Sequence, residues 1–70
     1  MDVSREKILK VISDNQPCST EELIATLGIN DKKDLVKLRR ILAELVRNGI
    51  LAKKPDYKRR KIVYVVKESQ

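Results

Sequence analysis

The 70-residue chain contains no histidine, tryptophan or phenylalanine, and it has only one cysteine, two glycines and two prolines. Because Cys18 is the single thiol, no intrachain disulfide can brace the fold. With no histidine and one cysteine, the chain lacks the nitrogen and sulfur ligands that hold structural zinc. Stability must therefore come from packing, and the 41% of hydrophobic residues, mostly Leu, Ile and Val, permit a core.

The same absences argue against an enzyme. The chain offers no histidine as a general base, no glycine-rich phosphate loop and no cluster of metal ligands. Cys18 precedes a predicted helix start, where a thiol pKa can fall. A packing role explains this cysteine more simply, although a reactive thiol stays open as the alternative. We expect no catalysis, no metal and no cofactor.

Long apolar runs are also missing, since the longest covers only residues 62–66. A membrane-spanning helix needs about 20 apolar residues, and a signal peptide also needs a longer run than this. We therefore expect no membrane partner. An unpaired cysteine agrees with an intracellular, cytoplasmic protein.

Charge is distributed unevenly along the chain, whose net charge is +6. Residues 1–31 hold three basic and six acidic residues, whereas residues 32–70 hold thirteen basic and four acidic ones. The two parts therefore carry net charges of −3 and +9. Such a division predicts a positive face for a polyanion. A lysine-rich solvated surface, as in thermophile proteins, is the alternative.

Hydrophobic periodicity predicts two helices in the first part of the chain, over residues 4–15 and 18–29. Ser4 or Asp2 caps the first helix, which ends before Pro17. In the second helix, Ser19 and Glu22 match a capping box, and Cys18 with Leu23 matches a hydrophobic staple. Gly28 is the expected left-handed residue at its end.

Residues 29–49 predict a longer third helix, which Asn30 or Asp31 caps and Asn48-Gly49 ends. At about 100° per residue, six apolar residues share one face: Leu35, Leu38, Ile41, Leu42, Leu45 and Val46. The opposite face carries Lys33, Lys37, Arg40, Glu44 and Arg47. The flank between them carries Lys32, Val36, Arg39 and Ala43. One side is therefore core and the other is largely basic.

After Gly49 the pattern changes to two short β-branched runs, which predict strands over residues 50–54 and 61–66. Pro55 and Asp56 predict the turn between them, because Pro sets φ and Asp tolerates the following position. The segment 53–61 thereby becomes the basic tip of a hairpin. We expect one domain over residues 1–70, with frayed ends at 1–3 and 67–70.

Three segments resemble the winged helix-turn-helix DNA-binding family: TEELIATLGI (20–29), LVKLRRILAELVRNGIL (35–51) and AKKPDYKRRKIVYVV (52–66). The run L-x-x-L-x-x-x-G-I-L from Leu42 to Leu51 is especially similar. The resemblance covers nearly the whole chain, and the composition is similar to small winged-helix proteins of archaea, their plasmids and viruses. It implies an α+β fold of three helices and a two-stranded wing, to which a short third strand near residues 17–19 can be added.

The resemblance further implies that the third helix enters the major groove of DNA, while the basic wing reaches the minor groove or the backbone. Lys37 and Arg40 would then reach base edges, because Arg to guanine is the commonest specific contact. Val36 would meet a thymine methyl, or alternatively pack against the second helix. Tyr57 would stack or hydrogen-bond, or alternatively pack on the hairpin. The predicted DNA-binding residues are Lys32, Lys33, Val36, Lys37, Arg39, Arg40, Arg47, Lys54, Tyr57, Lys58, Arg59 and Arg60.

The sequence therefore predicts a nucleoid-associated protein that binds double-stranded DNA and regulates transcription. A winged-helix module that docks onto another protein, within a larger nucleic-acid-processing assembly, is the alternative. RNA or single-stranded DNA is a weaker third choice, because only 3% of the residues are aromatic and base stacking needs aromatic side chains. A homodimer, formed for example through the first helix, also stays open.

Overall fold

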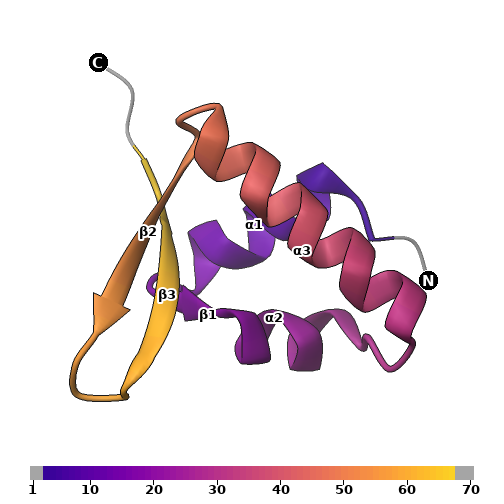
Figure 1. The fold of residues 1–70 in the computed structure, drawn as a ribbon, viewed down its shortest axis with the longest axis horizontal. Helices are drawn as coiled ribbons and strands as arrows, with labels where there is room; N and C mark the ends of the chain where they lie inside the picture. Colours follow the sequence, from indigo (N-terminus) through magenta and orange to yellow (C-terminus); the bar gives the residue numbers. More distant parts are fainter. Residues whose placement is uncertain (1–2, 68–70) are drawn as a thin grey trace.

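Three α-helices lie beside a small antiparallel sheet in the computed structural model, which describes residues 3–67 (Figure 1). The elements follow one another as α1 (Arg5–Asp14), β1 (Cys18–Ser19), α2 (Thr20–Leu27), α3 (Lys32–Arg47), β2 (Leu51–Asp56) and β3 (Lys61–Val66). The predicted α+β class and the order of the elements are confirmed. The short extra strand is also present, as β1. No helix formed by residues 3–67 has both the length and the apolar character needed to cross a bilayer.

Local side-chain chemistry accounts for the helix ends. The oxygens of Ser4 and Ser19 each accept a backbone N–H at the start of α1 and α2, and both distances are 3.2 Å. Asp31 does the same for the N–H of Lys33 at the start of α3. Gly28 closes α2 at φ 69°, in the left-handed region that glycine enters without strain. These predicted caps are confirmed.

The capping box at α2 is only half formed. Ser19 accepts from the Glu22 N–H as predicted, but Oε1 of Glu22 lies 2.9 Å from Nη1 of Arg59 in the hairpin loop. The backbone of Ser19 belongs to β1, where this residue pairs with Val63. A charged partner far along the chain thus takes the place of the expected contact to the Ser19 N–H.

The sheet has the order β1-β3-β2, with all neighbours antiparallel. Leu51 pairs with Val66, and Lys53 pairs with Tyr64. Because side chains two residues apart on a strand share a face, both pairs lie on the same face of the sheet. Leu51 is buried in the core, so Lys53 and Tyr64 continue the core-facing side of the sheet toward the hairpin loop.

The hairpin turn lies two residues later than the sequence predicted. Pro55 and Asp56 belong to β2, where Pro55 pairs with Ile62, and residues 57–60 form the loop. An edge strand tolerates proline because its missing N–H need not join the ladder. Asp56 still organises the turn, since its Oδ1 accepts the N–H groups of Lys58 and Arg59 at 3.1 and 3.2 Å. Arg60 ends the loop at φ 57°.

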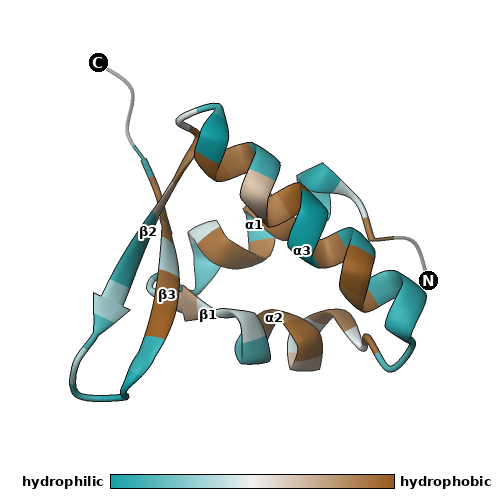
Figure 2. Ribbon diagram, viewed as in Figure 1, coloured by the Kyte–Doolittle hydropathy of each residue, from teal (hydrophilic) through white to brown (hydrophobic). Residues whose placement is uncertain are grey.

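The predicted apolar face of α3 forms one wall of the core. Leu38, Leu42 and Leu45 are at most 1% exposed, and they share one core cluster with residues of α1, α2 and β2. Hydrophobic and hydrophilic segments alternate along the ribbon of α3 (Figure 2). Val3, which the sequence placed among the terminal residues, is buried in this core. The Lys67 N–H donates to the Ile50 carbonyl at 2.9 Å. The other residues predicted to fray, 1–2 and 68–70, lie outside the described part of the chain.

Candidate nucleic-acid interface

The solvent side of α3 is where the sequence placed it. Three leucines fix the rotation of the helix, and the predicted basic side chains are therefore exposed along its length. The exposed basic residues are Lys32, Lys33, Lys37, Arg39, Arg40 and Arg47. Val36 is 54% exposed among them. Its alternative role, burial against α2, is therefore not supported.

A groove of about 440 Å³ separates this side of α3 from the sheet. Arg39 and Arg47 line the groove from α3, and Lys53 and Tyr64 line it from β2 and β3, with Thr20 at the start of α2. Since Lys53 and Tyr64 are direct cross-strand partners, the sheet presents a lysine beside an aromatic ring. Three cations from two separate elements thus surround one concave surface, which we call the α3–sheet groove.

Of the residues that line this groove, the sequence assigned only Arg39 and Arg47 to DNA binding. It did not assign Thr20, Lys53 and Tyr64, nor the α3 residues Leu42, Ala43 and Val46. Tyr64 was counted only as part of the predicted strand over residues 61–66, and Lys53 only as part of a basic segment. The alternation of side chains along β2 could have placed Lys53 on the same face as Leu51, and its cross-strand partner Tyr64 would then lie on that face as well. That inference also requires the register of the hairpin, which the misplaced turn obscured.

A second, smaller concavity of about 310 Å³ lies along α3 itself, lined by Arg40, Ala43, Glu44 and Arg47. Ala43 leaves room here because its side chain is a single methyl group. The carboxylate of Glu44 is held by Arg5 of α1, whose Nη2 lies 3.0 Å from Oε1. This ion pair offsets the one acidic charge in the concavity, so Arg40 and Arg47 dominate its electrostatics.

The N-terminus of α3 already carries an anionic group. Lys32 and Lys33 are exposed there as expected, but Oδ1 of Asp31 accepts the Lys33 N–H at 3.2 Å. A helix N-terminus attracts anions through its unpaired N–H groups and its dipole. The Asp31 carboxylate already pairs with one of these N–H groups, which weakens the attraction for an external anion. Any contact of phosphate at this end rests mainly on the two lysine side chains.

The residues of the β2–β3 hairpin that were predicted to bind DNA fall into two groups. Lys54, Tyr57, Lys58 and Arg60 are exposed, and Tyr57 is 85% exposed. Arg59 is exposed as well, but it is paired with carboxylates, with its Nη1 2.9 Å from Glu22 and its Nε 3.6 Å from Asp56. Nearby, Nζ of Lys61 lies 3.9 Å from Glu21. The loop is thus tied to the start of α2, and the charge of Arg59 is largely compensated within the molecule.

Cys18 is an inert part of the core. Its side chain is fully buried, and burial raises the pKa of its thiol above the ordinary value of 9.0, with a further contribution from the Glu22 carboxylate. A raised pKa disfavours the nucleophilic thiolate, so the structure favours the packing role over a reactive thiol. Within residues 3–67, no three metal-ligating side chains of His, Cys, Asp or Glu come together.

Comparison of the chain with protein-family models, with curated proteins and with solved structures finds no significant match. The residues and their geometry alone therefore carry the functional conclusion.

Proposed function

We propose that this chain is a winged-helix protein that binds double-stranded DNA, with α3 in the major groove. The β2–β3 hairpin then serves as the wing and lies on the flanking minor groove or the backbone. The observation that carries the proposal is the α3–sheet groove, where Arg39, Arg47 and Lys53 converge from two elements. Cations that merely keep a surface solvated need not converge on one concave surface.

The dimensions of α3 suit this role. Its 16 residues give a length of about 24 Å at about 1.5 Å per residue, and the major groove of DNA is wide enough to admit a helix. The exposed cations run along the helix from Lys32 to Arg47. Those at the two ends suit the phosphates on either side of the groove, and those in the middle suit the base edges.

Within this arrangement, Lys37 and Arg40 read bases from the outward side of α3, and Val36 contacts a thymine methyl. Arg39, Arg47 and Lys53 bind backbone phosphates around the α3–sheet groove, where Tyr64 supplies a flat surface for a sugar. These phosphate contacts supply most of the affinity, and the base contacts supply the preference for a sequence. Binding of this kind suits a small transcriptional regulator associated with the nucleoid.

A fluorescence-anisotropy titration of labelled duplex DNA over a salt series tests the proposal. Each phosphate that the protein neutralises lowers the slope of log K against log salt by about 0.9, so affinity should fall steeply as salt rises. Arg47→Gln should weaken binding and flatten the slope. Lys10→Gln, which removes an exposed charge from α1 outside both concavities, is the control and should change little. No binding at low salt, or a flat salt response, contradicts the proposal.

Docking onto another protein is the second candidate function. It is favoured by the exposed apolar residues of the hairpin, Tyr57 at 85% and Ile62 at 43% exposure. A partner that stays bound to the tagged chain after nuclease treatment, while the purified chain has no affinity for duplex DNA, would support docking instead. Selection of bound duplexes from a random pool gives the complementary answer, because one or two recovered half-sites reveal both the DNA target and the stoichiometry.

A further inference from the structure

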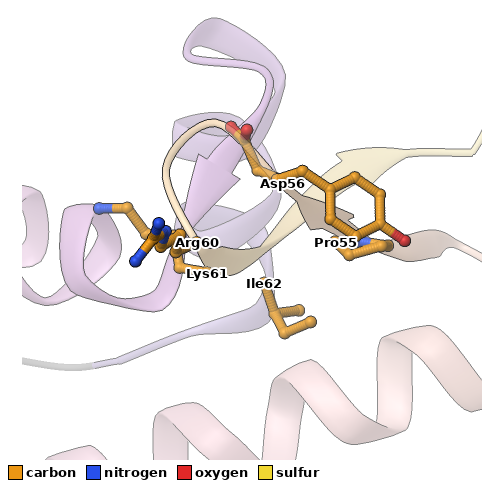
Figure 3. A pocket seen from close by; sticks show the side chains of 6 residues that line it. Pro55, Asp56, Arg60, Lys61 and Ile62 are labelled. Atoms are coloured by element: carbon orange, nitrogen blue, oxygen red, sulfur yellow. The ribbon is translucent and has the colours of Figure 1, made fainter.

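The basic hairpin carries an apolar pair near its tip. Pro55 and Ile62 are direct cross-strand partners on β2 and β3, and Ile62 is 43% exposed. Together with Tyr57 they line a hollow of about 390 Å³, whose remaining walls are Asp56, Arg60 and Lys61 (Figure 3). These apolar side chains near the end of the hairpin do not belong to the hydrophobic core.

The register of the sheet places this pair on the DNA-binding face that we propose. Ile62 and Tyr64 are two residues apart on β3, as are Lys53 and Pro55 on β2, so both cross-strand pairs share one face. The Lys53–Tyr64 pair lines the α3–sheet groove, and the Pro55–Ile62 pair therefore continues this surface outward. In Figure 3 the Ile62 side chain leaves the hairpin in a different direction from Arg60 and Lys61.

Phosphates offer such a pair no apolar partner, whereas the minor groove does. Its walls are deoxyribose rings and its floor exposes the edges of stacked bases, between which Ile and Pro side chains can insert. The minor groove next to a major-groove site lies about half a helical turn away, or about 17 Å. The structure extends over 32 by 28 by 19 Å, so the hairpin tip and α3 fit neighbouring grooves of one duplex.

The tip is also held in place before any DNA arrives. The Asp56 carboxylate accepts two N–H groups of the loop, and its Oδ2 lies 3.6 Å from Nε of Arg59 within the same loop. A surface ordered in advance loses less conformational entropy when it binds. Such a tip can press against a base step without first having to fold.

We propose that the Pro55–Ile62 pair, with Tyr57 beside it, is a wedge that enters the minor groove, partly unstacks one base step and bends the duplex. This inference rests on the proposed function, since it adds deformation of the DNA to the binding of DNA. The apolar pair is continuous with the basic α3–sheet groove, so cations lie on both sides of the pair. DNA would need these cations for its phosphates, whereas a protein partner would not.

Two measurements test the wedge. In the first, a duplex of the selected sequence carries a fluorescence donor at one end and an acceptor at the other, so that bending raises energy transfer. We expect a bend of about 20–90° with the unchanged chain. Ile62→Thr keeps a β-branched residue in the strand and should abolish at least half of the rise in transfer. Val65→Thr makes the same kind of change on the opposite face of β3 and should leave the rise intact.

In the second measurement, 2-aminopurine replaces adenine at successive steps beside the α3 site. Its fluorescence should rise several-fold at one step when the unchanged chain binds, because the base there loses its stacking. This readout needs no variant, so poor folding of Ile62→Thr would not affect it.

Tight binding to a duplex that stays straight, with quenched 2-aminopurine at every step, overturns the wedge and leaves the proposed function standing. A bend that Ile62→Thr fully retains also overturns it. Absence of any duplex binding removes the proposed function and the wedge together.

Discussion

Nη1 of Arg59 lies 2.9 Å from Oε1 of Glu22, which joins the tip of the β2–β3 hairpin to the first turn of α2. The two side chains are 50% and 38% exposed, so water screens the pair, and exposed ion pairs contribute only about 0–1 kcal/mol to stability. The contact is therefore too weak to be needed for folding. It nevertheless holds a carboxylate on an arginine of the proposed DNA-binding hairpin, where a phosphate would otherwise bind.

Glu22→Gln should therefore raise affinity for duplex DNA. Loss of the carboxylate releases Arg59 for a phosphate, and we expect a gain of about two- to fivefold at low salt, since about 1.4 kcal/mol corresponds to tenfold. The free energy of unfolding should fall by less than about 1 kcal/mol. Anisotropy titrations and urea unfolding measure the two effects.

Glu6→Gln is the matched control for this change, because Glu6 also lies in the first turn of a helix, α1, and is exposed. It removes the same charge from the chain without touching the hairpin. If both variants gain affinity equally, the gain comes from net charge alone, and the Arg59–Glu22 contact has no influence on binding.

Base contacts and phosphate contacts should respond differently to mutation. Arg40→Ala should reduce the preference for the selected duplex over a scrambled one by about 1–3 kcal/mol at one base position. Lys53→Ala should weaken binding to both duplexes alike and lower the salt slope by about 1. Titrations of both variants with both duplexes measure this. Equal losses on both duplexes for Arg40→Ala would contradict its assignment to base edges.

Arg60→Gly should shift stability and DNA affinity in opposite directions. Arg60 has φ 57°, a left-handed conformation that costs a residue other than glycine about 1–2 kcal/mol. Glycine removes this strain, so the free energy of unfolding should rise by about 0.5–1 kcal/mol after the entropy cost of glycine is subtracted. Affinity for duplex DNA should fall because one cation is lost. Urea unfolding that shows a loss of stability would contradict the strain.

Cys18 should make the fold less stable at alkaline pH. Burial and Glu22 raise the pKa of its thiol above 9.0 in the folded chain, so the unfolded chain loses this proton first as pH rises. The contribution of the thiol to stability is complete below the unfolded pKa and is lost as pH rises toward the folded pKa. In urea unfolding at pH ~8 and pH ~10, the parent chain should lose more stability than Cys18→Ala. Parallel losses would contradict the raised pKa.

Much of the fold could be predicted because its signals are local. Ser19, Gly28 and Asp31 act on backbone groups within a few residues of themselves, so the sequence places them without knowledge of the tertiary structure. The second strand of the hairpin was predicted over residues 61–66, where β3 lies. The turn was misplaced because the φ of proline suits both a turn and an edge strand, and only pairing with Ile62 distinguishes the two.

The parts that could not be predicted depend on residues far apart in the sequence. Glu22 had a local role as a capping partner, and its contact with Arg59, 37 residues away, depends on where the hairpin folds back. Lys53 and Tyr64 join Arg39 and Arg47 in one groove only because the sheet packs beside α3. The periodicity of α3 placed the arginines, whereas no pattern within β2 or β3 indicates which helix lies opposite.

The position of Pro55 has a further consequence for the chain in a crowded solution. In the order β1-β3-β2, β2 lies at an edge of the sheet formed by residues 3–67. Such edges are where chains add strand to strand and grow into fibrils. Pro55 cannot donate a backbone hydrogen bond, and Lys53 and Lys54 before it would place like charges beside one another in any stack of identical copies. The proline that obscured the turn in the sequence thus makes this edge a poor template for amyloid growth.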